Sequence, residues 1–256
     1  MERIVLKIGG SELDNLAFVD GLVETLRALC KERAIVLVHG GGKAIARLQE
    51  QLRLDPHFVD GLRVTDDASL DVAEMVLSGL VNKRLVGRLV WEGIPAVGLS
   101  GVDNGMIRVV KMQHDHHDLG WVGDVVEAHP IEVEGLMEKG VVPVVSPISL
   151  GLDGHTYNVN ADHAAAALAA ALGAAELVFV SNVPGVLTRD CAEGECVPAL
   201  TEREVETLVA SGEIHGGMVP KVRSALGALA TGIPCVRITD LKGLTTDGGT
   251  CFLPQK

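Results

Sequence analysis

Aromatic residues are scarce in this sequence. Its 256 residues include two tryptophans, one tyrosine and four phenylalanines. Proteins that bind single-stranded nucleic acids stack the bases on aromatic side chains, and few such side chains exist here. Positive charge is also in deficit, because 22 Lys and Arg residues stand against 34 Asp and Glu, a formal net charge of −12. Phosphate backbones are bound by clustered cations, so we expect no nucleic-acid partner.

Long hydrophobic runs and paired cysteines are also absent. No stretch approaches the roughly 18 apolar residues of a membrane span, and the first apolar run, Ile4 to Leu6, is too short for a secretory signal. We expect no membrane association. The five cysteines are odd in number, and the C-x4-C pair Cys191 and Cys196 lacks the two further ligands that zinc needs. We therefore expect a cytoplasmic protein with reduced thiols and no metal ligands of its own.

Strand and helix patterns alternate along the chain, which predicts an α/β fold with a mostly parallel sheet covered on both faces. The expected strands are residues 4–8, 35–38, 96–99, 141–145, 177–180, 235–238 and 250–253. The expected helices are residues 16–29, 43–52, 66–89, 131–139, 162–172, 201–211 and 218–231. Residues 106–127 are expected to form a β-hairpin. The loop-rich stretch from Pro147 to Asn160 is the expected boundary between an N-terminal and a C-terminal lobe.

The tip of that expected hairpin carries three histidines, His114, His116 and His117. Such a cluster can bind a metal ion, but a solvated loop is the favoured interpretation.

Glycines follow the first two expected strands as Gly9-Gly10 and Gly40-Gly41-Gly42. Ligands of parallel sheets bind at the carboxyl ends of the strands, where glycine lets backbone N–H groups approach an anion. Tight turns would explain either cluster alone, whereas two clusters on neighbouring strands favour an anion site. Neither has the spacing of a Walker loop or of a dinucleotide fingerprint. Lys7 interrupts the first apolar strand. Its side chain would lie either on the solvent-exposed side of an edge strand or facing a phosphate group.

Several polar residues stand at positions where the apolar pattern is interrupted. Asn158, Asn160 and Asp162 alternate at the start of an alanine-rich helix, where helix capping explains one or two of them. Arg63 precedes a capped helix and can grip a carboxylate with two hydrogen bonds. Lys221 follows Pro220 in the first turn of another helix, and on its own would be an ordinary surface residue.

Taken in order, these segments resemble the amino acid kinase family, and within it the members that phosphorylate N-acetyl-L-glutamate in arginine biosynthesis. The resemblance covers essentially the whole chain. The matching segments are Lys7 to Gly10, His39 to Gly42, Gly61 to Thr65, Asn82-Lys83, Gly98 to Gly101, Asn158 to Asp162, Ser181 to Val186 and Gly217 to Lys221.

The resemblance implies a three-layer αβα sandwich in one amino acid kinase domain. Its N-terminal lobe, about residues 1–150, would hold the amino acid and the dimer contact, and its C-terminal lobe, about 151–256, would hold ATP. The reaction implied is transfer of the ATP γ-phosphoryl group to the substrate's side-chain carboxylate. Mg²⁺ would bind mainly through the nucleotide phosphates.

The resemblance also implies a role for each matching residue. The catalytic residues would be Lys7, Lys221 and Asp162, with Asp162 orienting both lysines. The substrate-binding residues would be Gly41, Gly42, Arg63, Asn158 and Asn160. The ATP-binding residues would be Gly9, Gly10, Asn182, Val183, Pro184, Gly185, Val186, Leu187, Glu213, Ile214 and His215.

Two alternative functions belong to the same fold. One is a kinase of the lysine pathway that acts on aminoadipate attached to an acidic carrier protein, and the net charge of −12 argues against such docking. The other is a non-catalytic sensor, in which loss of Lys7, Asp162 or Lys221 would be expected, and all three are present.

The start of the sequence gives an expectation about assembly. Arginine-inhibited relatives carry a helix before the first strand that links dimers into a hexameric ring, and here Met1 to Arg3 are too few for a stable turn. We therefore expect a homodimer, no inhibition by arginine, and no signalling partner that docks on a ring.

Overall fold

The computed structural model describes residues 1–188, 191 and 196–254. Its helices are α1 (Gly10–Leu13), α2 (Leu16–Leu29), α3 (Gly42–Gln51), α4 (Asp67–Glu74), the π-helical turn η1 (Met75–Val81), α5 (Asn82–Trp91), the 3₁₀ turn η2 (Asp103–Gly105), α6 (Ile131–Glu138), α7 (Ala161–Ala171), α8 (Glu202–Ala210), α9 (Met218–Ala230) and α10 (Leu241–Thr246). Its strands are β1 (Glu2–Ile8), β2 (Arg33–His39), β3 (Phe58–Val59), β4 (Leu62–Arg63), β5 (Ala96–Gly101), β6 (Ile107–Lys111), β7 (Val122–Ala128), β8 (Val142–Gly151), β9 (Thr156–Val159), β10 (Glu176–Val180), β11 (Ala199–Thr201), β12 (Val236–Thr239) and β13 (Thr250–Leu253).

One large sheet runs through the molecule in the order β11-β13-β12-β10-β1-β2-β8-β6-β7-β9, with β5 paired to β8. The central strands β12, β10, β1, β2 and β8 pair in parallel. Antiparallel pairs join β12 to β13, β6 to β7 and β8 to β9. The α/β class is therefore confirmed, and the sheet is mixed.

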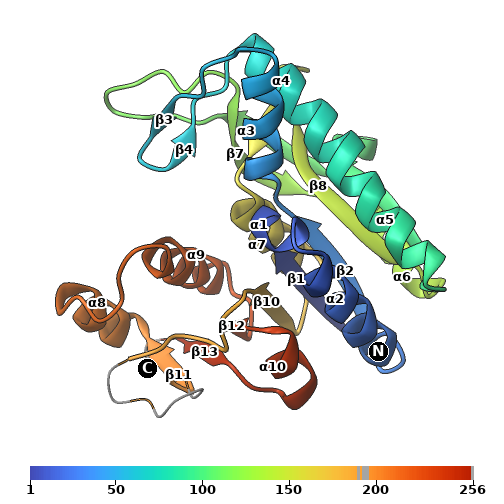
Figure 1. The fold of residues 1–256 in the computed structure, drawn as a ribbon, viewed down its shortest axis with the longest axis vertical. Coiled ribbons are helices and arrows are strands. Elements are labelled where there is room, and N and C mark those ends of the chain that lie inside the picture. Colours follow the sequence, from blue (N-terminus) through green and yellow to red (C-terminus); the bar gives the residue numbers. More distant parts are fainter. Residues whose placement is uncertain (189–190, 192–195, 255–256) are drawn as a thin grey trace.

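Alternate residues of the central strands face two separate cores. Val5 of β1 lies in a core with α6, α7 and α9, whereas Leu6 lies in a second core with α2, α5 and α10. Successive side chains of a strand point to opposite faces, so burial on both faces explains the apolar run Ile4 to Leu6 in β1. Helices therefore cover both faces of the sheet. The C-terminal elements α8, α9 and β11–β13 gather at one end of the molecule, and α3, α4 and the β3–β4 pair at the other (Figure 1).

Local sequence signals explain where the helices begin. The Asn15 side chain accepts hydrogen bonds from the first turn of α2, and Asp66 does the same for α4. Thr201 and Glu204 form a reciprocal capping box at α8. Each bond satisfies a backbone N–H group that has no partner within the helix.

The prediction of a loop-rich stretch between Pro147 and Asn160 is wrong. Strand β8 continues to Gly151, and β9 returns antiparallel beside it. The sequence misleads here because Pro147, serines and glycines are typical of loops. Pro147 lies where the β5–β8 register shifts, between the pairs Ser100–Ser146 and Gly101–Ser149. A strand tolerates proline at such an irregularity because no ladder hydrogen bond is lost there.

A small hairpin, β3–β4, is a structural element that the sequence analysis missed. Its two-residue turn consists of Asp60 and Gly61, both with positive φ (48° and 82°). An Asp-Gly pair with positive φ at both positions is favoured in two-residue hairpin turns. The flanking strands have two residues each, too few to show an alternating pattern.

No helix in the described part of the chain is long and apolar enough to cross a membrane.

Candidate active site

The two glycine clusters predicted to form an anion site lie against each other. A Cβ atom at Gly10 would lie 2.6 Å from both the Cα and the N of Gly41. Real Cβ atoms do not approach backbone so closely, so a side chain at position 10 would push the two loops apart. The Gly40 N–H also donates to the Ile8 carbonyl over 2.9 Å. The ends of β1 and β2 therefore form one continuous stretch of backbone, in which Gly10 and Gly40 are half-buried and Gly41 is buried.

A buried histidine, whose role the sequence analysis missed, holds this stretch. His39 is fully buried, and burial lowers its pKa to about 4, so the ring is neutral at pH 7. Its Nδ1 lies 3.1 Å from the Gly40 carbonyl oxygen and its Nε2 lies 3.2 Å from Nδ2 of Asn82. Since the amide of Asn82 donates, the ring proton belongs on Nδ1 and is donated to Gly40. Asn82 also donates to the Val144 carbonyl over 2.8 Å, which ties β2, α5 and β8 together beneath the loop.

The predicted catalytic residues Lys7 and Asp162 form an ion pair, with Lys7 Nζ 2.5 Å from Asp162 Oδ1. The two side chains are 18% and 15% exposed, so water screens their attraction less than at the surface. Asp162 Oδ1 is buried and has no hydrogen-bond partner of good geometry among the described residues. The Lys7 ammonium is therefore what compensates the carboxylate charge, and the pair joins β1 to the first turn of α7.

Lys221, on α9, reaches the same place from the C-terminal side. Its Nζ donates to Ser181 Oγ over 2.6 Å. Lys7, Lys221, Gly9 and Ser181 line one small cavity of about 160 Å³, which we call the lysine cavity. Asp162 pairs with Lys7, while Lys221 bonds to Ser181. The expectation that Asp162 orients both lysines stays a prediction, and its contact among the two lysines is with Lys7. Ser181 is a site residue whose role the sequence analysis missed.

A second cavity, of about 210 Å³, contains every residue predicted to bind the amino acid. We call it the arginine cavity. Its lining includes Gly41, Gly42, Arg63, Asn158 and Asn160. Because these residues come from α3 and its preceding loop, from the β3–β4 hairpin and from the segment β9–α7, only the folded chain brings them together.

Within the arginine cavity, Arg63 is held on three sides. Its guanidinium donates to Gln49 Oε1 and, over 3.1 Å, to the Gly42 carbonyl, and it lies 4.6 Å above the centre of the Phe58 ring. Stacking on an aromatic ring and bonding to two acceptors fix the plane of the guanidinium. Its position is therefore set before any ligand binds.

The two asparagines combine capping with lining the cavity. Asn160 is the N-cap of α7, because its Oδ1 accepts from the Asp162 N–H over 2.8 Å. The Asn158 amide donates to Thr65 Oγ1 over 3.2 Å. The capping alternative is thus correct for Asn160, and Asn158 links β9 to the segment that follows the β3–β4 hairpin.

The two cavities are joined through backbone. Gly9 lines the lysine cavity, and its neighbour Gly10 contacts Gly41 of the arginine cavity. On the other side, Asn160 of the arginine cavity is two residues from Asp162, the partner of Lys7. The linings of the two cavities are therefore adjacent along the backbone.

Of the residues predicted to bind ATP, Gly9 lines the lysine cavity and the others line neither cavity. Asn182 to Leu187 form the loop after β10, where Val186 is buried and its N–H donates to Thr250 Oγ1 over 2.8 Å. Of residues 213–215, Ile214 is buried in the core and the His215 ring contacts the Glu213 carbonyl. The ATP role of these residues stays a prediction. The side chains of Asn182, Leu187 and His215 are exposed.

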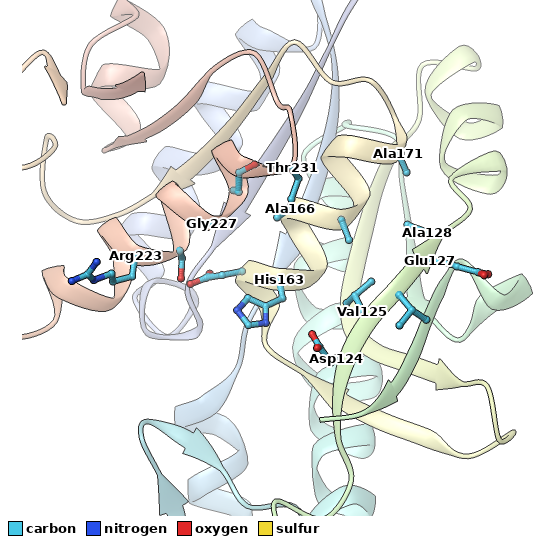
Figure 2. Close-up of a pocket in the computed structure, with 15 residues that line it drawn as sticks. Asp124, Val125, Glu127, Ala128, His163, Ala166, Ala171, Arg223, Gly227 and Thr231 are labelled. Carbon is cyan, nitrogen blue, oxygen red and sulfur yellow. Dashed lines mark hydrogen bonds between the residues drawn. The ribbon is translucent and has the colours of Figure 1, made fainter. Parts of the chain in front are cut away.

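A larger groove of about 570 Å³ lies elsewhere, between β7, α7 and α9. Figure 2 shows His163 of α7 and Gly227 and Arg223 of α9 around it, with Asp124 and Glu127 on the strand side. Of the predicted catalytic and binding residues, Asp162 lines this groove. Greater volume alone does not make it the reacting site, because the glycine loops and the two lysines line other cavities.

Among the residues that the structure describes, no three His, Cys, Asp or Glu side chains are placed to hold a metal ion. This includes the histidines of the loop at residues 114–117. They contact each other and Asp60 instead, with His114 Nε2 3.1 Å from Asp60 Oδ2.

The model of the amino acid kinase family matches residues 2–240. This chain belongs to the amino acid kinase family. The acetylglutamate kinase of Roseiflexus sp. (strain RS-1) is 51% identical over 253 residues, which span 99% of this chain and 94% of that protein. The acetylglutamate kinase of Geobacillus kaustophilus is 45% identical, over 97% and 94% of the two chains. Among solved structures, smu.665 of Streptococcus mutans UA159 matches with a TM-score of 0.80 and 29% identity over 98% of each chain.

The resemblance to the amino acid kinase family that the motifs predicted is therefore confirmed, over nearly the whole chain.

Proposed function

We propose that this chain is the kinase that transfers the γ-phosphoryl group of ATP to the side-chain carboxylate of N-acetyl-L-glutamate, a step of arginine biosynthesis. The observation that carries the proposal is the junction of the two cavities. A pair of lysines lies beside a cavity that presents an arginine and glycine backbone. The names of relatives about 50% identical over the full length support the same activity.

The reaction needs no general base. A carboxylate is ionised at pH 7, so one of its oxygens attacks the γ-phosphorus directly. The bond from that phosphorus to the bridging oxygen of ADP breaks, and its electron pair leaves with ADP. What the protein must supply is alignment and neutralisation of the oxygen charges. We assign neutralisation to Lys7 and Lys221, and hydrogen bonding of the phosphoryl oxygens to the backbone N–H groups near Gly10 and Gly41.

The substrate's α-carboxylate is assigned to Arg63 and Asn158. The planar guanidinium matches a carboxylate with two parallel hydrogen bonds, and its contacts with Gln49 and Phe58 already hold it in place. Gly41, Gly42 and Asn160 complete the pocket. Asp162 acts by holding the Lys7 ammonium group through their ion pair rather than by moving a proton.

ATP is assigned to the C-terminal lobe, along Gly9, Gly10, residues 182–187 and residues 213–215. Mg²⁺ would supply positive charge on the phosphate oxygens and be held mainly by the nucleotide. We propose the lobe division at about residues 150 and 151, close to the end of β8, with a homodimer formed through the N-terminal lobe.

The test is a substrate panel. The purified chain is given ATP and Mg²⁺ with N-acetyl-L-glutamate, free L-glutamate or aminoadipate, and ADP release is measured. We expect turnover that depends on N-acetyl-L-glutamate and at least tenfold lower kcat/KM for the other two. Equal or faster turnover of aminoadipate would favour the lysine-pathway alternative, and no turnover of any acceptor would favour the sensor.

A further inference from the structure

The β3–β4 hairpin forms a wall of the arginine cavity but lies outside the main sheet. It is a separate two-stranded sheet, and it contributes Phe58, Leu62 and Arg63 to the cavity lining. A hairpin of two strands is marginally stable by itself. The position of Arg63 therefore depends on contacts that the hairpin makes with other segments.

A single loop contacts the hairpin at both ends. We call residues 112–121, between β6 and β7, the bracing loop. At the base of the hairpin, the Thr65 N–H donates to the Leu119 carbonyl over 3.0 Å, and the Trp121 N–H donates to the Thr65 carbonyl over 2.7 Å. At the tip, His114 meets Asp60 at the hairpin turn. Figure 1 shows the loop before β7 running beside β3 and β4.

The His114 ring is held so that it can donate to Asp60. Its Nδ1 accepts the His116 N–H over 3.3 Å, which places the ring proton of the neutral form on Nε2. Nε2 then donates to Asp60 Oδ2 over 3.1 Å. The His114 side chain is 19% exposed, against 81% for Asp60, so the loop orders the donor and the hairpin supplies the acceptor.

The bracing loop is itself fixed at its root. Lys111 Nζ lies 2.7 Å from Asp118 Oδ1, and the same carboxylate oxygen accepts the Gly120 N–H over 2.8 Å. The Trp121 ring N–H donates to Asp67 Oδ1 over 2.6 Å, which anchors the loop to α4. A loop tied down at this end can transmit its position to the hairpin tip.

From these contacts we infer that His114, through Asp60, is a positioning residue for the amino-acid substrate. By holding the tip of the β3–β4 hairpin, it keeps Arg63 over the arginine cavity. This inference rests on the proposed function, since it assigns the cavity to the acylated amino acid. His114 does not touch the substrate, so its loss affects substrate binding and leaves phosphoryl transfer unchanged.

The expected effect is specific but modest, because hydrogen bonds and ion pairs with an exposed partner contribute little. His114→Ala should raise KM for N-acetyl-L-glutamate about two- to fivefold, with kcat and KM for ATP unchanged. His114→Gln places an amide N–H near the position of Nε2 and should restore most of the lost affinity. His116→Ala is the matched control, because it removes an imidazole from the same loop and keeps the backbone N–H that His114 accepts.

A double-mutant cycle tests whether the two residues act through each other. Asp60→Gly removes the carboxylate and keeps a residue suited to φ of +48°. It should raise the same KM by the same factor as His114→Ala, and the double variant should show no further increase. Additive effects would contradict the inference.

Amide hydrogen exchange of the full-length protein without ligand supplies a readout that is independent of activity. Exchange of the hairpin amides, residues 57–64, should become several-fold faster in His114→Ala, return in His114→Gln, and stay at the wild-type rate in His116→Ala. Unchanged exchange and unchanged KM in His114→Ala would overturn the inference. If the wild-type chain fails to phosphorylate N-acetyl-L-glutamate, the proposed function falls, while the exchange experiment still decides whether His114 holds the hairpin.

Discussion

The lysine cavity and the arginine cavity are built in different ways. The lysine cavity takes its charged side chains Lys7, Glu12 and Lys221 from β1, α1 and α9, and Asp162 of α7 compensates the charge of Lys7. The arginine cavity takes its cation from a two-stranded hairpin, and Arg63 bonds to neutral acceptors. Groups on core elements suit the reacting atoms, where small displacements cost most. The β3–β4 hairpin, which lies outside the main sheet, is suited instead to binding the substrate at a distance from the reacting atoms.

The largest expected effect is at the lysine cavity. Lys7→Ala and Lys221→Ala should each lower kcat about 100-fold or more, since each removes a charge that stabilises the transferring phosphoryl group. KM for N-acetyl-L-glutamate should change less. Steady-state kinetics with both substrates measures this, and Lys139→Ala, at an exposed lysine at the end of α6, is the control. Near-normal kcat in both active-site variants would remove the distinction between the two cavities.

The next largest effect is expected at the contact between Gly10 and Gly41. Gly10→Ala places a Cβ 2.6 Å from the Gly41 backbone, so the two loops must separate. We expect a loss of about 1–3 kcal/mol in the free energy of unfolding, as for other overpacked sites, together with a fall in kcat. Gly42→Ala is the matched control for the stability measurement, because its Cβ meets nothing within 4 Å. Equal stability of the two variants in urea unfolding would show that the contact does not constrain the loops.

His39, beneath the glycine loop, predicts a pH dependence of stability. Its pKa is about 4 in the folded protein and about 6.5 when unfolded, so the unfolded state binds the proton more tightly. The stabilisation is therefore present above pH 6.5 and is lost as the pH falls towards 4, by about 2 kcal/mol at pH 4.5. The comparison is the unfolding free energy at pH 7 and 4.5 in wild type and His39→Gln. The variant should lose about 2 kcal/mol less than wild type, and equal losses would show that His39 is protonated in the folded state.

The smallest of these effects concerns Arg63. Arg63→Lys should raise KM for N-acetyl-L-glutamate about tenfold with little change in KM for ATP, because an ammonium lacks the planar pair of donors. Arg203→Lys, at an exposed position on α8, is the control. A larger rise in KM for ATP would place Arg63 with the nucleotide and reverse the assignment of the two cavities.

The parts of the fold that follow from local chemistry were predictable from the sequence. The apolar run of β1, the caps Asn15 and Asp66, and the glycines after β1 and β2 each have a local physical reason, and the structure confirms these elements. The extension of β8 past Pro147 was not predictable, because the register shift that accommodates the proline depends on β5. The β3–β4 hairpin is too short to produce a periodic pattern.

For the candidate site, the residue types in the sequence suggested which side chains take part. Only the tertiary structure reveals which residues these side chains contact. Lys7 and Asp162 stand out because charge interrupts apolar segments, whereas Lys221 was predicted from the resemblance to the family. Ser181 as the partner of Lys221, and His39 as the support of Gly40, depend on neighbours far away in the sequence. His114 also stands out in the sequence, but its contact with Asp60 joins residues 54 positions apart.

The most direct test of the account is detection of the acyl phosphate itself. The chain is incubated with ATP, Mg²⁺ and N-acetyl-L-glutamate, and the product is trapped with hydroxylamine as a hydroxamate and quantified beside ADP. The account predicts one hydroxamate per ADP, formed with N-acetyl-L-glutamate and reduced about 100-fold in Lys7→Ala. ADP release without hydroxamate, or equal hydroxamate formation by wild type and Lys7→Ala, would contradict it.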